Sequence, residues 1–443
     1  HISSETAQAA RIDPDFGANG IARATLVSGS NSAGPSQALA QLPSGKILVL
    51  GNQEITDLPG GRSDQMVLAR FSARGRLDRA FGQGGLIYGA ELPASSKWDS
   101  FGYGEDITVT RSQQILVAGP EIPTFSGLVG DSWLNDCAFV ARFSLAGKLD
   151  RSFGSQGRST QCLNLDRHHS VGLNPVSINV NGAGRILIGG EVLAAGRSTL
   201  PFVARFERGG SLDRSLVGNR RTRSGERGIV RLARSETGRI GEVLPTRGGG
   251  ALAVGSVGGR VLVSRLNANG SPNVHFGRRG FFIRDLDAFP RCDCSDATAA
   301  AFDRAGRTII VGAWSRQPGM DHPKLLVIRL RRNGHLDKTF GKNGIFKANL
   351  KRDFESTSVA IQRNGKIVVG GSYELPKKGG VFGLVRITSS GRLDRSFFNR
   401  GVFAPSGRGL GVSATDVITD SSGRILAAGI GDQDLPVIRI KPQ

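Results

Sequence analysis

Short apolar runs that close on glycine recur seven times along the chain. Each run is rich in isoleucine, valine, leucine or alanine and is too short for a stable helix, so it predicts a buried strand. The copies start 57 to 71 residues apart, and this variation predicts loops of different length between fixed elements. They are GKILVLG at 45–51, QQILVAG at 113–119, GRILIGG at 184–190, GGALAVG at 249–255, GRTIIVG at 306–312, GKIVVGG at 365–371 and GRILAAG at 423–429.

Further strand patterns flank each run. An alternating segment such as SVAIQ at 358–362 precedes the run, and another such as FVARF at 139–143 follows it. A turn-rich LDRSFG, as at 149–154, then leads to a short segment such as NGIFK at 343–347. Each unit therefore predicts four strands, here called A to D, and strand B is the glycine-bounded run.

Seven such units predict an all-β chain folded as a seven-bladed β-propeller with four-stranded antiparallel blades. A helical solenoid is excluded because no long amphipathic stretch of period 3.6 is present. We expect residues 12–443 to form this single domain. Residues 1–11 are polar and small, and they are expected to be a linker or a processed remnant.

An arginine in strand C precedes an aspartate of the following turn by eight residues in most units. Arg439 has no such partner downstream, and Asp13 has none upstream. We therefore predict that these two residues pair, so that the N-terminal strand D at 20–26 lies beside 435–440 and completes the C-terminal blade. The complete pairs are Arg70 and Asp78, Arg142 and Asp150, Arg205 and Asp213, Arg329 and Asp337, and Arg386 and Asp394, and Arg265 precedes Asn273 by the same interval.

The other residues of the LDxxFG turn also have expected structural roles. Its phenylalanine is expected to pack between neighbouring blades, and its glycine to relax the turn. The aspartate is expected to accept hydrogen bonds from the turn or from the strand C arginine. We do not interpret the pair as catalytic, because an enzyme seldom needs seven copies of one site.

These motifs resemble the delta-60 repeat family, whose consensus runs as DGKILVAG, an alternating strand ending in AR(F/Y), and GxLDxxFGxxG. The resemblance covers residues 12–440. It departs in blade four, where strand B is GGALAVG and the turn is SPNVHFG, and after blade three, where RRTRSGER is inserted at 220–227. The family implies a bacterial extracytoplasmic propeller, and it implies no common activity.

The net charge of +21 does not come from the repeated pairs. Seven arginines and six aspartates account for only +1, so about +20 belongs to loops and exposed strand faces. A field of that sign attracts polyanions, and we expect an anionic polysaccharide or a cell-envelope polymer as partner. A generally arginine-rich composition is the alternative. Sequence-specific nucleic-acid binding is disfavoured, because no such motif is present and aromatic residues make up only 6%.

Four cysteines bear on the compartment. Cys137 opens strand C of blade two and Cys162 closes strand D, so the two sulfurs should lie opposite one another in antiparallel strands, which predicts a disulfide. Together with the resemblance, this predicts a secreted or extracytoplasmic protein, and we expect a monomer. Cys292 and Cys294 lie two residues apart in RCDCSD, where either a tight disulfide or half of a metal site is open. No stretch reaches the about 20 apolar residues that span a membrane.

The longest non-repeating segments are B–C and D–A connections, which share one face of a propeller. All three tryptophans and an adjacent histidine pair fall in them, and this predicts a binding surface around the channel mouth. The expected ligand-binding residues are Trp98, Asp99, Tyr103, Glu105, Trp133, Arg167, His168, Trp314 and His322.

Acidic residues recur where strand A enters the channel, namely Glu105, Asp106, Asp296 and Glu355. They could bind Ca²⁺, act as a general acid/base pair, or cap turns and pair with arginines. No cofactor is otherwise expected. The candidates for catalysis are His168, His169 and Tyr103, since lyases of acidic polysaccharides need a base beside a cationic group. Two classes of function remain open: a non-catalytic binding protein, and an extracellular lyase or hydrolase.

Overall fold

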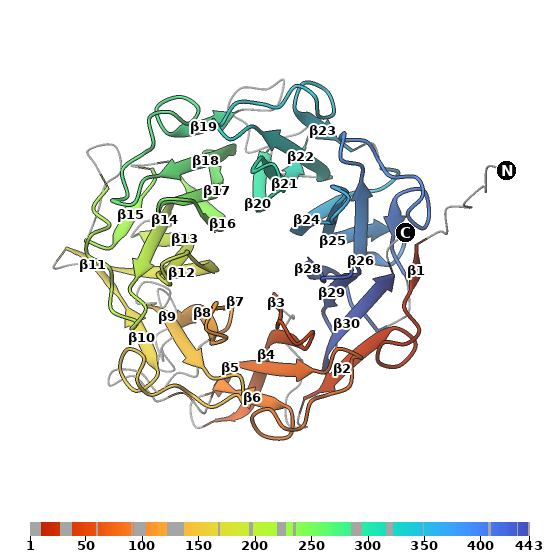
Figure 1. Cartoon of the computed structure of the whole chain (residues 1–443), viewed down its shortest axis with the longest axis horizontal. Coiled ribbons are helices and arrows are strands. Elements are labelled where there is room, and N and C mark those ends of the chain that lie inside the picture. Colours follow the sequence, from red (N-terminus) through yellow and green to blue (C-terminus); the bar gives the residue numbers. More distant parts are fainter. Residues whose placement is uncertain are drawn as a thin grey trace.

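The computed structural model describes residues 10–26, 38–58, 61–89, 92, 103–121, 137–166, 169–194, 198–218, 227–233, 236–284, 295–315, 322–348, 350–405, 409–431 and 433–441. These residues form seven antiparallel sheets that stand around a central axis as the blades of a propeller (Figure 1). Strand A of each blade lies innermost and strand D lies at the rim. The predicted seven-bladed fold is confirmed.

Blades one to three show the predicted order of strands A to D, with one addition. Strand β11 precedes strand A of blade three and pairs with it, where the sequence predicted only a loop. Blade one contains β3 (Ala38–Gln41), β4 (Ile47–Leu58), β5 (Gly61–Phe71) and β6 (Leu86–Tyr88), blade two β7 (Asp106–Val109), β8 (Ile115–Glu121), β9 (Cys137–Phe143) and β10 (Arg158–Gln161), and blade three β11 (Leu163–Asp166), β12 (His169–Val180), β13 (Ile186–Ala194), β14 (Ser198–Phe206) and β15 (Ile229–Arg231).

Blades four to six have four strands each, and blade seven is assembled from both ends of the chain. Blade four contains β16 (Gly238–Pro245), β17 (Ala251–Val257), β18 (Arg260–Leu266) and β19 (Phe281–Arg284), blade five β20 (Ser295–Phe302), β21 (Thr308–Trp314), β22 (Lys324–Leu330) and β23 (Ile345–Lys347), blade six β24 (Phe354–Ile361), β25 (Ile367–Leu375), β26 (Gly379–Ile387) and β27 (Val402–Phe403), and blade seven β28 (Ala414–Thr419), β29 (Ile425–Gly429) and β30 (Asp434–Lys441) with β1 (Arg11–Ile12) and β2 (Ile21–Thr25).

The ring closes by pairing β1 and β2 with β30, as the unpaired Arg439 and Asp13 predicted. Ile21 lies opposite Ile438, and the ladder continues antiparallel to Thr25 opposite Asp434. The Nε of Arg439 donates to Oδ2 of Asp13 at 2.7 Å, and both side chains are buried. Residues more than 400 positions apart thus form the same contact that the other blades make within one turn.

The strand C arginine also joins its blade to the next one. In blade two the Nε of Arg142 donates to Oδ2 of Asp150 at 2.9 Å, and its Nη1 donates to the carbonyl of Arg208 in blade three at 2.7 Å. The other carboxylate oxygen of Asp150 accepts the backbone N–H of Ser152, which caps the turn. The aspartate therefore fills both roles expected of it.

The phenylalanine of LDxxFG and a glycine of the next blade complete this junction. In five blades the strand C guanidinium lies 4.4–4.7 Å from the ring centroid of that phenylalanine. Gly75 of blade one adopts φ +77°, and a Cβ there would approach Phe16 of the preceding blade to 2.9 Å. Only glycine fits both the backbone angle and the space.

Seven hydrophobic clusters lie between neighbouring blades, one at each interface. One of them joins Leu48 and Phe81 of blade one to Ile115 and Phe139 of blade two. Another joins Ala24 and Leu435 of blade seven to Val49 of blade one. Closing the ring therefore buries an apolar interface equivalent to the other six.

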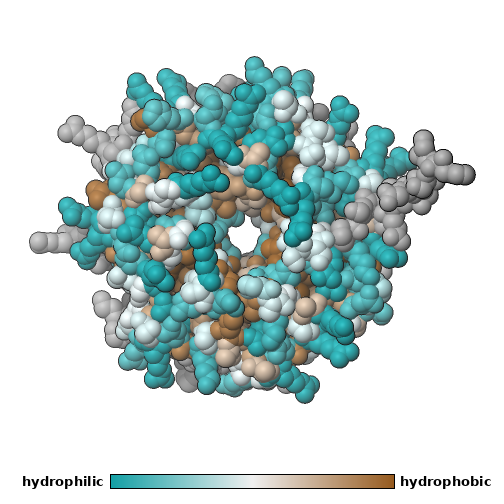
Figure 2. Space-filling model, viewed as in Figure 1, coloured by the Kyte–Doolittle hydropathy of each residue, from teal (hydrophilic) through white to brown (hydrophobic). Residues whose placement is uncertain are grey.

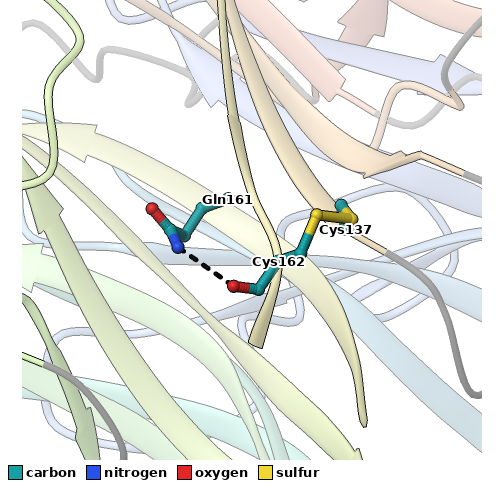
Figure 3. Close-up of a disulfide and its surroundings, with 3 residues drawn as sticks. All are labelled: Cys137, Gln161 and Cys162. Atoms are coloured by element: carbon teal, nitrogen blue, oxygen red, sulfur yellow. Dashed lines mark hydrogen bonds between the residues drawn. A yellow bond between two sulfur atoms is a disulfide. The ribbon is translucent and has the colours of Figure 1, made fainter. Parts of the chain in front are cut away.

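A disulfide between Cys137 and Cys162 links the outer strands of blade two (Figure 3). The two Cα atoms are 4.4 Å apart, Cys137 opens β9, and Cys162 follows directly on β10. The pairing predicted from the antiparallel order is confirmed. The described residues include no other cysteine, and Cys292 and Cys294 lie outside them.

Candidate functional site

The innermost strands surround an open channel along the propeller axis (Figure 2). Strand A carries a β-bulge in blades three to seven, with a register shift such as that between Pro175 and Ser177. A bulge turns the next side chain toward the adjacent blade and frees a backbone N–H beside it. This local irregularity positions the polar side chains of the channel.

Side chains of strand A bind the next blade, and two of them, Ser177 and Asp416, directly follow a bulge. The hydroxyl of Ser177 accepts the N–H of Val243 at 3.1 Å, and a carboxylate oxygen of Asp106 accepts the N–H of Ile178 at 2.7 Å. Asp416 accepts the N–H of Leu39 at 2.7 Å, across the junction of blades seven and one. Asp106 therefore caps backbone N–H groups, one of the alternatives considered for the acidic residues.

Burial changes the protonation of the carboxyl groups in the channel. Burial raises the pKa of Asp106 to about 8, against the hydrogen bonds that it accepts. Burial and the neighbouring charges of Asp106 and Asp416 raise the pKa of Glu242 well above its usual value, and burial also raises the pKa of Asp416. Burial thus raises the pKa of all three carboxyl groups above that of an exposed carboxyl group.

More carboxylates lie at one mouth of the channel. Burial and the charge of Glu191 raise the pKa of Glu105 to about 7. Arg239 donates to Asp296 at 2.8 Å. The pKa of the Arg239 guanidinium is raised mainly by the charge of Asp296, and less by those of Glu191 and Glu355. One arginine thus faces several acidic groups, so the described part of this mouth is acidic although the whole chain is basic.

No three metal-ligating side chains converge anywhere in the described part of the chain. Asp296 instead pairs with Arg239, which is the arrangement expected of an acidic residue facing a surplus of arginines. The Ca²⁺ alternative at Glu105 and Glu355 stays a prediction.

The structure describes four of the nine predicted ligand-binding residues. Tyr103 and Glu105 lie together just before β7, and the amide of Tyr103 donates to the carbonyl of Pro120 at 3.2 Å. His322 contacts Asp353 at 2.8 Å, and Lys324 contacts the same carboxylate, so this cluster connects blade five to the start of blade six. Trp98, Asp99, Trp133, Arg167 and His168 lie outside the described residues.

Trp314 does not lie in a loop, contrary to the prediction. It is the last residue of β21, pairs in register with Lys324, and packs against the cluster between blades four and five. The ammonium of Lys347 lies 4.0 Å from the centroid of its ring. Strand β21 extends two residues past Gly312, whereas the sequence pattern predicted that the strand ends at this glycine. His169 opens β12, also within a segment predicted to be a loop.

The opposite face, formed by the A–B and C–D turns, has grooves between neighbouring blades. The groove between blades two and three has a volume of about 590 Å³, and Arg111, Arg142 and Arg208 line it. The equivalent groove between blades four and five has a volume of about 350 Å³. Arg247, Arg265, Arg304 and Arg332 line it, together with Phe302. Sequence reasoning missed these grooves because their residues belong to the repeated turns.

Comparison with known proteins supports the fold and leaves the function open. A family model described as a β-propeller domain of unknown function (DUF5122) matches residues 184–216 and 362–397. No curated protein matches the chain. No helix in the described residues has the length and apolar character needed to span a membrane.

Several solved structures are similar to the chain at low identity. The WD40 β-propeller domain of Doa1 is 10% identical, with 96% of this chain and 98% of that chain covered and a TM-score of 0.43. The PL25 ulvan lyase is 9% identical, with 94% and 95% covered and a TM-score of 0.46. The gluconolactonase XC5397 of Xanthomonas campestris is 13% identical, with 98% and 96% covered and a TM-score of 0.39. Such distant likeness carries no functional argument.

Proposed function

We propose that the protein is an extracytoplasmic propeller of the delta-60 repeat type that binds an anionic glycan. The observation that carries this proposal is the separation of charge: carboxylates turn inward, and arginines line the outer grooves. Six aspartates lie in the Arg–Asp pairs and seven carboxylates lie in the channel or at its mouth. The disulfide supports an oxidising compartment.

Removing these thirteen carboxylates and the seven arginines that pair with them leaves 51 cations and 24 carboxylates for the rest of the chain. Such an excess favours polyanions, and the arginine-lined grooves offer concave places for individual acidic groups. We therefore assign the anion to the A–B and C–D face. Trp98, Trp133 and the other residues of the loop face are proposed as additional contacts, because the described part of that mouth is acidic.

Retention on immobilised polygalacturonate at two ionic strengths tests the proposal. We expect strong retention at 20 mM salt and elution well below 1 M, since salt screens exposed charges over about 3 Å at 1 M. A column of neutral dextran is the control. Equal retention on both columns, or none on polygalacturonate at low salt, would contradict the proposal.

A second candidate is a lyase or hydrolase acting at the channel mouth. It is favoured by the pKa of Glu105, which lies near 7, where a carboxyl group can serve as general acid or base. Tyr103 lies two residues away, and His168 and His169 are proposed to supply the remaining groups. Unsaturated uronate products absorbing in the ultraviolet would support a lyase. Binding of polygalacturonate without turnover would favour the binding protein.

A further inference from the structure

Blade four breaks the arginine–aspartate rule at one atom. In the other six blades the Nε of the strand C arginine forms an ion pair with the aspartate Oδ2 at 2.6–2.9 Å. Asn273 takes the aspartate's place beside Arg265, and its Oδ1 still caps the turn by accepting the N–H of His275 at 3.1 Å. Its Nδ2 donates to Oδ1 of Asn267 at 2.9 Å, and an amide nitrogen cannot accept from arginine.

A second charged group is missing from the same place. In four blades the charged residue after the glycine that opens strand B also contacts the aspartate, as Lys46 contacts Asp78 at 2.8 Å. In blade two the uncharged Gln114 makes this contact with Asp150. Blade four has Gly250 at this position. The carboxylate and its second partner are therefore absent together, and Arg265 has no counter-ion among the described residues.

The space beside Arg265 belongs to the groove of about 350 Å³ between blades four and five. The guanidinium of Arg265 is oriented by one hydrogen bond, from Nη1 to the carbonyl of Arg332 at 3.1 Å. Arg332 is itself held by the carbonyl of Ala305 at 2.6 Å. The acidic lining residue Asp303 is already engaged by the Nε of Arg307 at 2.6 Å, so it does not neutralise Arg265.

We propose that this groove binds the carboxylate of a uronic acid residue in an anionic glycan, with Arg265 as the primary ligand. The inference rests on the proposed function and names its subsite. A carboxylate is the group that occupies this place in the other six blades, and arginine matches its planar geometry with two parallel hydrogen bonds. Arg247 and Arg304 add charge at the rim, and Phe302, which is 38% exposed, offers an apolar surface to the sugar ring.

The groove between blades two and three is an internal comparison. It has the same relation to its two blades, but Arg142 is occupied by Asp150 at 2.9 Å, and Gln114 contacts the same carboxylate. A uronate would have to displace a side chain that is already in place. We therefore expect the blade four groove to bind and its blade two equivalent not to bind.

The test restores the missing carboxylate with Asn273→Asp. The new side chain should keep the turn cap and engage Arg265 as in the other blades, so thermal stability should not fall. Binding of trigalacturonate, measured by calorimetry at low ionic strength, should weaken at least tenfold. The matched control is Asn269→Asp, which adds the same charge on the same turn, where Asn269 caps Ser271 and is exposed. That variant should bind trigalacturonate within about twofold of the wild type.

Three outcomes would overturn the subsite. They are equal loss of binding in both variants, unchanged binding in Asn273→Asp, and equal affinity of the wild type for inorganic phosphate and trigalacturonate. The methyl ester of trigalacturonate should bind poorly, because esterification removes the charge. If Asn273→Asp elutes from polygalacturonate at the same salt concentration as the wild type, the subsite is wrong but the proposed function stands. If the wild type is not retained on polygalacturonate, the proposed function is wrong, whether or not trigalacturonate binds.

Discussion

The contact that closes the ring offers a direct test of what holds the propeller together. Asp13 and Arg439 are 1% and 4% exposed, and Lys441 adds a second contact to Asp13 at 3.1 Å. Asp13→Asn places an asparagine where blade four has Asn273, but blade seven lacks the hydrogen-bond acceptor that Asn273 has in blade four. Asn267, which accepts from Asn273, corresponds in blade seven to Lys441, and an ammonium group cannot accept.

The expected cost follows from the burial of the pair. Removing one partner of a buried ion pair costs about 3–5 kcal/mol, because the remaining charge stays buried without compensation. Asp15→Asn is the control, since Asp15 contacts the same lysine at 3.0 Å but its side chain is 78% exposed. That surface pair should contribute about 0–1 kcal/mol. Adding Lys441→Asn to Asp13→Asn recreates the blade four arrangement and should recover part of the loss.

Denaturant unfolding at pH 7 measures these free energies, and a pH series checks their origin. Burial alone would raise the pKa of Asp13, but hydrogen bonds from Lys441, the Asp15 amide and Arg439 outweigh it and lower the pKa. The contribution of Asp13 is therefore present above the usual pKa of aspartate and is lost as pH falls through the lowered value. The difference between wild type and Asp13→Asn should shrink in acid. A loss below 1 kcal/mol at pH 7 would refute the reasoning.

Three further predictions concern pH, the disulfide and the loop face. Because folding raises the pKa of Glu105 to about 7 and of Asp106 to about 8, stability should fall as pH rises from about 4 to 8. Glu105→Gln should flatten a plot of melting temperature against pH, and an unchanged slope would exclude Glu105 as a cause. Reduction of the Cys137–Cys162 disulfide, whose cysteines are 25 residues apart, should cost about 3 kcal/mol and lower the melting temperature. The same reductant should not change the melting temperature of Cys137→Ser/Cys162→Ser, which lacks this disulfide. Trp98→Ala/Trp133→Ala should weaken glycan retention without lowering the melting temperature, and full retention would remove these tryptophans from the contact surface.

The fold could be predicted because its determinants are local and repeated. The strand B run, the strand C arginine and the LDxxFG turn of one unit lie within about 40 residues, and their periodicity gives the number of blades. Ring closure also followed, since Arg439 and Asp13 each lack the partner that the rule requires. The disulfide could be placed once the antiparallel order of β9 and β10 was known.

The candidate site was less predictable because it depends on residues from different blades. Glu242 and Asp416 of the acidic channel follow bulges in strand A, and no local sequence pattern identified these bulges. Trp314 continues β21 beyond the glycine because its ring gains packing against the blade four and five cluster and a contact with Lys347. The exchange of aspartate for Asn273 was visible in the sequence, but the groove beside Arg265 became apparent only from the position of Gly250 and the neighbouring blade.

The pairing of β1 and β2 with β30 also bears on how such a protein can change its size during evolution. The junction between the first and last strands falls inside a blade, so every complete repeat contributes part of one blade and part of the next. Duplication or loss of one repeat by recombination would therefore add or remove a whole blade while the same two ends still meet. A ring built in this way can vary its number of blades without a new closing contact, provided that its curvature tolerates the change.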